Sequence, residues 1–282
     1  MKKLSIIYRA YPGISKKPII DFKDKDEMIA FSLASLKKAL KNIEYEFIFL
    51  SDNCTKNQIN IVENIMRQDA RRFTIKQYPG IGNMESFSKQ IDSVESALFD
   101  HILILEDDYF IDRHDIDLNL HQLAENIDIH YSTFYYSIDS ENTFGGMKIA
   151  QKESDNISLT FLPSTTLTFF ANKNILLEDL KYFKEFSNGT HDSSLWLRLT
   201  GKFIWFLPKI RKPLFWKNKY LFLSIVKRYF THMTKHKYKK RKLVFIGLGR
   251  STHLETEGIF NQFNLVSYIS LQFSKWKISI NK

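Results

Sequence analysis

The chain of 282 residues has only one cysteine, Cys54, and few glycines and prolines, 10 and 6 respectively. One cysteine excludes an intrachain disulfide, and the scarcity of glycine and proline excludes a collagen-like or linker-rich organisation. No apolar run approaches the roughly 18 residues of a membrane span, and the run at residues 4–8 is too short for a signal-peptide core. The single cysteine and the lack of a signal-peptide core lead us to expect a cytoplasmic protein. With 44% hydrophobic residues, we also expect a substantial core.

Acidic residues are missing from a long C-terminal segment. Between Ser193 and Leu254 there are 16 Lys or Arg and no Asp or Glu, whereas the rest of the chain holds 25 basic and 31 acidic residues. The net charge of +10 therefore comes from this segment alone. Such a segment indicates an anionic partner, of which nucleotide phosphates, lipid head groups and nucleic acid are the candidates.

Strand and helix patterns alternate along the first hundred residues. Short apolar runs typical of buried strands lie at residues 4–8, 46–50, 73–75 and 101–105. Apolar residues at helical spacing separate them; we expect Asp26 to cap the first helix and Leu98 to face inward from the third. The alternation predicts an α/β fold with a mostly parallel sheet flanked by helices on both faces.

Three carboxylates, Glu106, Asp107 and Asp108, directly follow the last of these strands. Ligands of such sheets gather at the carboxyl ends of the strands, and Mg²⁺ or Mn²⁺ prefers one or two carboxylates together with substrate phosphates. On an extended chain Glu106 and Asp108 would project to the same side and share a metal ion. A solvated turn is the alternative. Tyr11 and Asp52, at the ends of two other strands, favour the metal interpretation.

Four segments resemble family 2 glycosyltransferases of the GT-A fold, in the family's order and over roughly the first 200 residues. Residues 4–11 resemble the opening strand, residues 47–55 the second strand with its nucleobase-contacting turn, and residues 103–108 the strand ending in the Asp-x-Asp motif. Residues 191–199 resemble the acidic-pair helix, which usually reads Glu-Asp, two residues, then Leu-Trp-x-Arg.

The resemblance implies a metal-dependent transfer of a sugar from a nucleoside-diphosphate donor, with Mg²⁺ or Mn²⁺ as cofactor. Asp52 would contact the nucleobase, and Tyr11 would line that pocket. Glu106 stands at the family's first Asp, which implies ribose or metal contact, and Asp107 belongs to the same donor-binding turn. Asp108 would bind the metal ion that bridges the donor phosphates.

Asp192 falls on the family's catalytic base, which would take the proton of the acceptor hydroxyl and give inversion at the anomeric carbon. The alternative is a helix N-cap, a position that Asp favours. The family's preceding Glu is His191 here, which we assign to acceptor contact or packing. His253 matches the late metal-binding His of several GT-A enzymes, or is structural, and Arg250 would meet the diphosphate.

The basic segment itself has two interpretations. Residues 214–233 carry apolar and aromatic residues at roughly helical spacing, and six basic residues follow between Lys235 and Lys242. An amphipathic helix beside a basic cluster suits docking on anionic lipid; a core-packed helix with a solvated charge run is the alternative. We expect a GT-A-like catalytic domain over residues 1–212 and a basic, helical C-terminal extension over residues 213–282 packed on it. Residues 1–110 would form its nucleotide-binding half and residues 111–212 its acceptor-side half.

Together these features predict an inverting glycosyltransferase with a donor that the resemblance suggests is UDP-linked. Its acceptor would be a glycan or lipid-linked glycan of bacterial surface polysaccharide synthesis, such as capsule or lipopolysaccharide. The protein would lie in the cytoplasm, free or peripheral on the inner face of the cell membrane. One alternative is a nucleotidyltransferase, for which residues 11–17 are a poor triphosphate loop. A nucleic-acid-binding protein is another, but it leaves the acidic strand end and Asp192 unexplained.

Overall fold

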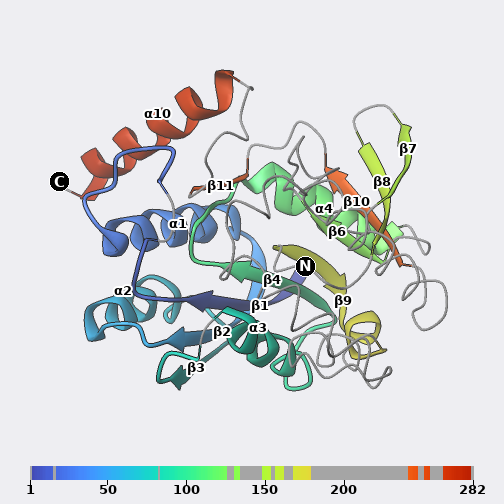
Figure 1. Ribbon diagram of the computed structural model, residues 1–282, viewed down its shortest axis with the longest axis horizontal. Helices are drawn as coiled ribbons and strands as arrows, with labels where there is room; N and C mark the ends of the chain where they lie inside the picture. Colours follow the sequence, from blue (N-terminus) through green and yellow to red (C-terminus); the bar gives the residue numbers. More distant parts are fainter. Residues whose placement is uncertain are drawn as a thin grey trace, which may run out of the picture.

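The computed structural model describes residues 2–14, 17–81, 83–125, 130–133, 148–153, 156–161, 168–178, 241–246, 251–254 and 263–280. In this part of the chain a nine-stranded mixed sheet forms the centre, in the order β3-β2-β1-β4-β9-β6-β10-β8-β7 (Figure 1). A separate two-stranded sheet consists of β5 (Tyr109–Phe110) and β11 (Thr252–His253).

The N-terminal half of the sheet consists of four parallel strands connected through helices. The strands are β1 (Lys2–Ala10), β2 (Ile43–Asp52), β3 (Arg72–Tyr78) and β4 (His101–Glu106). The helices between them are α1 (Lys25–Ala39), α2 (Lys56–Met66) and α3 (Asn83–Asp92). All four strands coincide with the apolar runs of the sequence.

The other half of the sheet is mixed. Its strands are β9 (Phe169–Asn172), β6 (Tyr131–Thr133), β10 (Arg241–Ile246), β8 (Asn156–Phe161) and β7 (Lys148–Glu153). β10 lies parallel to β6 and antiparallel to β8. The end of the predicted basic cluster, Arg241 and Lys242, thus belongs to a strand inside the main sheet.

The strand β1 distributes its side chains between two cores. Leu4, Ile6 and Tyr8 pack on one face with residues of α1, α2 and α4 (Arg113–Glu125), whereas Ile7 packs on the other face with residues of α3. Successive side chains of a strand point to opposite faces, so an uninterrupted apolar run is what a sheet covered on both faces requires.

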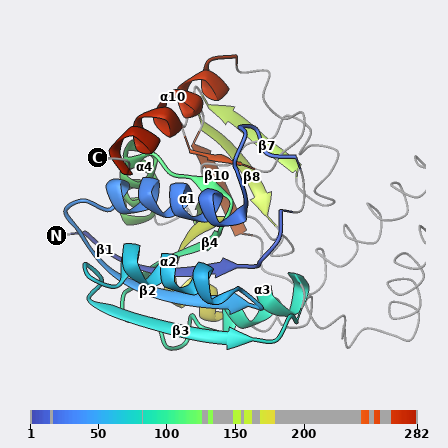
Figure 2. The ribbon, with the colours of Figure 1, turned by 90° about the vertical axis from the view of Figure 1, so that its left-hand side faces the viewer.

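The C-terminal helix α10 (Phe263–Ile280) forms a further layer outside α1 (Figure 2). Phe273 of α10 packs against Phe22 and Phe31, with ring centroids 5.0 and 5.1 Å apart. The predicted α/β fold with flanking helices and a C-terminal helix is confirmed. The sheet is parallel from β3 to β4 and mixed beyond β4, with four parallel and four antiparallel strand pairs in the described residues. Among the helices described, none has both the length and the hydropathy that crossing a bilayer requires.

Two local predictions were wrong. The N-cap of α1 is Asp24, whose side chain accepts the N–H of Glu27 at 2.9 Å, and not Asp26. The side chain of Asp26 instead accepts hydrogen bonds from Gln58 and Asn57. Leu98 lies beyond the end of α3 and is 47% exposed, because the helix stops at Asp92.

Candidate functional site

The carboxyl ends of β1, β2 and β4 meet at one edge of the sheet. In the paired register Ala10 lies opposite Ser51, and Arg9 lies opposite Glu106. The parallel topology therefore brings together the loop at Tyr11, the turn at Asp52 and the acidic turn that starts at Glu106. This is the edge at which parallel α/β sheets hold ligands.

The acidic triplet does not continue as an extended strand. β4 ends at Glu106, and Asp107 and Asp108 form a turn before β5. The prediction that Glu106 and Asp108 project to one side of an extended chain was therefore wrong.

Asp107 is fully buried and held by two donors. Lys25 Nζ lies 3.1 Å from its Oδ1, and the backbone N–H of Tyr11 donates to its Oδ2 at 3.1 Å. Burial, together with repulsion from Asp108, raises the pKa of Asp107 to about 7, although Lys25 and the Tyr11 N–H act against this shift. Both oxygens of Asp107 thus link the acidic turn to α1 and to the loop after β1, rather than facing a donor molecule.

Lys25 also meets the ring of Tyr11. Its Nζ lies 4.3 Å from the ring centroid, and only 4% of its side chain is exposed. A cation over an aromatic face is attracted by the ring quadrupole. One ammonium group therefore fixes both a carboxylate of the acidic turn and the aromatic ring predicted to line the nucleobase pocket. Sequence reasoning missed Lys25, since a lysine in the first turn of an amphipathic helix ordinarily faces water.

Glu106 forms an ion pair with Arg9 of the neighbouring strand. The side chains are 17% and 6% exposed, so the pair is partly withdrawn from water. Arg9 was also missed by sequence reasoning, because the pair depends on the register that sets β1 against β4.

The turn after β2 is fixed to the loop after β3. Asp52 Oδ1 accepts the N–H of Ile81 at 2.7 Å, and the N–H of Asn53 donates to the carbonyl of Tyr78 at 2.8 Å. Asn53 and Gly80 both have a left-handed backbone, with φ of 62° and 86°. Gly80 suits this conformation because it has no Cβ. The part of the site that was predicted to contact the nucleobase thus consists of two turns joined by hydrogen bonds.

Cys54 lies beside this turn and is half-buried. Burial raises the pKa of its thiol to about 11, and the nearby carboxylates of Asp107 and Asp52 add to the shift, against hydrogen bonds from Ser51 and the Asp52 backbone.

A segment from far along the chain closes over the acidic turn. β11 pairs with β5 so that His253 lies opposite Tyr109, and the N–H of Leu254 donates to the carbonyl of Asp108 at 2.6 Å. Three more hydrogen bonds hold this segment. Asp115 Oδ2 accepts the N–H of Ser251 at 2.5 Å, Ser251 Oγ accepts the N–H of Asp112 at 2.8 Å, and the N–H of Ile19 donates to the carbonyl of Leu254 at 2.9 Å. The backbone of His253, predicted as a late metal ligand, is therefore placed next to the acidic turn.

Other predicted site residues lie outside the described residues: Asp192, His191 and Arg250. Among the residues described, no group of three or more His, Cys, Asp or Glu side chains is arranged to hold a metal ion. Glu106 and Asp107 are already paired with cations. Asp108 is 4% exposed, so the third carboxylate of the triplet is also withdrawn from water.

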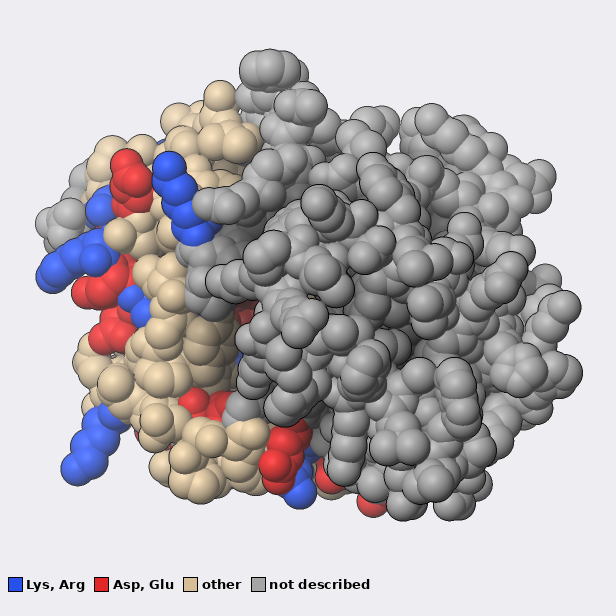
Figure 3. Space-filling view, viewed as in Figure 1, with Lys and Arg blue, Asp and Glu red and all other residues tan. Residues whose placement is uncertain are grey.

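Charges of both signs mix on the visible part of the face in Figure 3, where Lys and Arg lie beside Asp and Glu in the described residues. The described part of this face therefore presents no extended surface of one sign.

Comparisons with known proteins gave structural similarities only. No protein-family model and no curated protein matches the chain. A cytidylyltransferase from Leptospira borgpetersenii aligns with a TM-score of 0.37 and 15% identity, over 72% of this chain and 73% of its own. An active-site mutant of LgtC aligns with a TM-score of 0.41 and 13% identity, over 71% of this chain and 70% of its own. S. aureus TarS 1–349 aligns with a TM-score of 0.42 and 16% identity, over 64% of this chain and 49% of its own. At these TM-scores and identities the similarities carry no argument about function.

Proposed function

We propose that this chain is a glycosyltransferase that uses a nucleoside-diphosphate sugar, with UDP as the favoured nucleotide. The observation that supports the proposal is the meeting of three strand ends at one sheet edge, with β11 closing over the acidic turn. The N-termini of α1 and α2 follow β1 and β2 at this edge, and helix N-termini favour negatively charged groups such as phosphates.

Different described residues would bind different parts of the donor. Tyr11, fixed by Lys25, and Asp52 would hold the nucleobase, and Glu106, paired with Arg9, would contact the ribose. Asp108 would hold Mg²⁺ or Mn²⁺ with the donor phosphates. When bound, the ion neutralises the charge that builds on the leaving nucleoside diphosphate.

The acceptor side of the proposal rests on the family resemblance. Asp192 would take the proton from the acceptor hydroxyl, with inversion at the anomeric carbon, while His253 and Arg250 would approach the diphosphate with β11. The acceptor would be a glycan or lipid-linked glycan of a bacterial surface polysaccharide. The protein would act in the cytoplasm, with peripheral contact at an anionic membrane through its basic segment.

The experiment that tests this proposal is a thermal-shift screen of UDP, CDP, GDP and ADP, each with and without Mn²⁺. A ligand at a hundredfold excess over its dissociation constant stabilises the native state by about 2.7 kcal/mol. For a domain of this size we expect a rise in Tm of about 5 to 10 °C. One nucleotide should produce this rise in the presence of metal, with a much smaller effect without it.

Two substitutions test whether the thermal shift depends on the acidic turn. Asp108→Asn keeps the size of the side chain and should abolish the metal-dependent part of the shift. Asp100→Ala, an exposed aspartate before the start of β4, is the matched control and should leave the shift unchanged. Stabilisation by nucleoside triphosphates alone would favour the nucleotidyltransferase alternative. No shift with any nucleotide, with salt-sensitive binding of RNA or DNA, would overturn the proposal.

A further inference from the structure

The side-chain amide of Gln58, in the first turn of α2, joins three segments of the chain. Its Oε1 accepts the N–H of Thr55 at 3.0 Å, and its Nε2 donates to the carbonyl of Pro12 at 3.3 Å and to Asp26 Oδ1 at 2.8 Å. Gln58 is only 2% exposed, so water has little access to these bonds. An amide offers one oxygen and two N–H groups, and here the oxygen and the NH2 group are both engaged.

Each of the three segments belongs to the candidate site. Pro12 directly follows Tyr11 in the loop after β1. Asp26 directly follows Lys25, the cation that contacts both the ring of Tyr11 and the acidic turn. Thr55 is the N-cap of α2 and follows the turn after β2 that was predicted to contact the nucleobase. One buried side chain therefore connects the parts of the site that come from β1, α1 and β2.

A capping box at the start of α2 accounts for only one of these bonds. Thr55 Oγ1 accepts the N–H of Gln58 at 3.2 Å, and the Oε1 of Gln58 accepts the N–H of Thr55 in return. That exchange needs only a side-chain oxygen at this position, which a glutamate supplies equally well. The NH2 group reaches Pro12 and Asp26 instead, so the amide does more than begin the helix.

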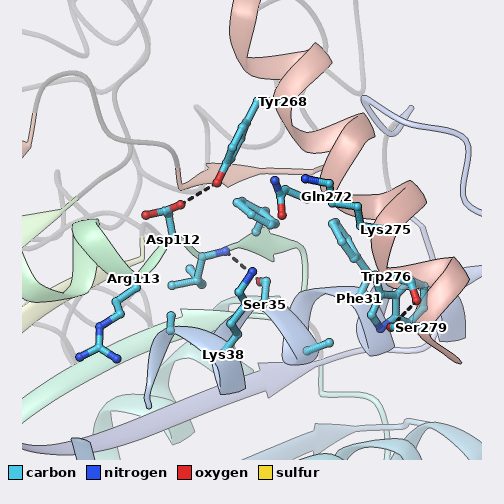
Figure 4. A pocket seen from close by; sticks show the side chains of 14 residues that line it. Phe31, Ser35, Lys38, Asp112, Arg113, Tyr268, Gln272, Lys275, Trp276 and Ser279 are labelled. Carbon is cyan, nitrogen blue, oxygen red and sulfur yellow. Dashed lines mark hydrogen bonds between the residues drawn. The ribbon is translucent and has the colours of Figure 1, made fainter. Parts of the chain in front are cut away.

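The two bonds of the NH2 group differ in importance, because α1 has other supports. Asn57 Nδ2 donates to the second carboxylate oxygen of Asp26 at 2.6 Å. On the side of α1 that faces α10, the ring of Phe31 packs against Trp276, with ring centroids 5.6 Å apart (Figure 4). The carbonyl of Pro12, in contrast, accepts a hydrogen bond from no other residue that the structure describes. The loop after β1 therefore depends on this amide more than α1 does.

We propose that Gln58 is a positioning residue of the donor site, which holds the loop after β1 against the acidic turn and thereby raises the affinity for the nucleotide. The N–H of Tyr11 donates to Asp107 Oδ2 at 3.1 Å, so the acidic turn holds this loop from one side and Gln58 from another. A loop that is ordered before binding loses less conformational entropy when the ligand arrives. That the ligand is a nucleotide rests on the proposed function; Gln58 itself acts only through the loop.

Two variants separate the bond to the loop from the bond to α1. Gln58→Glu keeps the size of the side chain and the oxygen that accepts the N–H of Thr55, but a carboxylate cannot donate to Pro12 or Asp26. Adding Asp26→Asn exchanges the amide and the carboxylate between the two positions. This double variant has the charge of the wild type and regains the bond between α1 and α2 with donor and acceptor reversed, yet it offers no donor to Pro12.

Asn57→Asp is the matched control. It makes the same change from amide to carboxylate beside Asp26, at an exposed residue whose side chain does not bond Pro12. It should leave both the exchange of the Tyr11 amide and the affinity for UDP unchanged.

Three measurements distinguish positioning from stability. In the protein without nucleotide, hydrogen exchange of the Tyr11 amide should be about tenfold faster in Gln58→Glu and in the double variant, while exchange of the Thr55 amide is unchanged. Binding of UDP with Mn²⁺, followed by isothermal calorimetry, should weaken about tenfold in both. The free energy of unfolding in urea should fall in Gln58→Glu and recover in large part in the double variant.

Unchanged exchange of Tyr11 in Gln58→Glu would overturn the proposal, because other contacts would then hold the loop. Recovery of UDP affinity together with stability in the double variant would also overturn it, since Gln58 would then act only by joining α1 to α2. A wild-type protein that binds no nucleoside diphosphate would contradict the proposed function alone, and the exchange of Tyr11 would still decide whether Gln58 holds the loop.

Discussion

A lysine and an aspartate meet at the acidic turn in an almost dry environment. The side chains of Lys25 and Asp107 are 4% and 0% exposed. Withdrawing two charges from water is costly, and breaking such a pair by removing one partner leaves an uncompensated charge. The role of Lys25 is therefore that of a positioning residue, which acts on the site through Asp107 and Tyr11.

Replacing Lys25 should show this dependence directly. Lys25→Met is expected to lower the free energy of unfolding by about 3 kcal/mol, as measured by urea denaturation. The double variant Lys25→Met/Asp107→Asn should be less destabilised than the sum of the single changes, because neither charge is then left alone.

Lys3→Met is the matched control. Lys3 lies 3.6 Å from Glu44 and its side chain is 56% exposed, so its removal should cost no more than about 0.5 kcal/mol. Equal effects of the two lysine substitutions, or strict additivity in the double variant, would contradict the assignment of Lys25.

The thiol of Cys54 provides a second test at a single residue. Its pKa of about 11 keeps the thiol protonated at neutral pH, and the thiolate is the reactive species. In the native protein the rate of reaction with a disulfide reagent should rise about tenfold per pH unit between pH 7 and 10. At pH 7.5 it should be about 300-fold slower than in urea, where the pKa returns to about 8.5. A native rate equal to the rate in urea would mean that the thiol is neither buried nor shifted.

At the scale of elements, the short strand β11 joins two distant parts of the chain. Ser251 Oγ accepts the N–H of Asp112, and the N–H of Ser251 donates to Asp115 Oδ2, so one serine fixes the N-terminal end of this segment. This arrangement keeps Thr252 and His253 against β5, beside Asp108.

Ser251→Ala removes the acceptor of the Asp112 N–H. It should cost about 1–2 kcal/mol and speed amide hydrogen exchange of residues 109–112 and 252–254. If the proposed function is correct, the metal-dependent nucleotide shift should fall as well. Ser274→Ala, whose exposed hydroxyl donates to Ser270 within α10, should change none of these quantities. Unaltered exchange in the Ser251 variant would show that β11 is held by other contacts.

At the scale of the whole molecule, α10 adds a third core to the two that cover the sheet. Phe273 lies at its centre, 8% exposed, and touches the rings of Phe22, Phe31 and Trp276. Lys277 connects the same helix to Glu27 of α1 at 2.9 Å. The outer layer should therefore unfold together with the sheet.

Phe273→Ala should lower the free energy of unfolding by about 3 kcal/mol or more, because it removes a buried ring and leaves a cavity. Leu271→Ala, at 51% exposure on the same helix, should change it by less than about 0.5 kcal/mol. Circular dichroism during urea unfolding measures both. A separate early transition in the Phe273 variant would instead show that α10 unfolds independently.

The parallel half of the fold was predictable because its signals are local. The run at residues 4–8 is apolar at every position but Ser5, and strand ends of a parallel sheet must share an edge. The pairings that tune the site were not predictable, because Lys25 and Asp107 are 82 positions apart. Nothing in either local sequence separates a buried charge from a solvated one.

The strand β10 shows the same limit at the level of elements. The sequence suggested that Arg241 and Lys242 end a solvated basic cluster. In the structure they belong to a strand and lie opposite Phe161 and Thr160 of β8. Strand pairing between residues so far apart leaves no local periodicity to detect. The predicted contributions of Asp192 and Arg250 concern residues outside those described.

The place of β10 has a consequence for synthesis of the chain. It lies between β6 and β8, yet it follows β6 by about a hundred residues, which take roughly 5–20 seconds to translate at 5–20 residues per second. During that interval both strands present an open edge, and β11 has not yet reached the acidic turn. The nascent protein therefore passes through a state that is capable of pairing with another strand and lacks part of its site, so chaperone demand should be greatest just before this strand emerges from the ribosome.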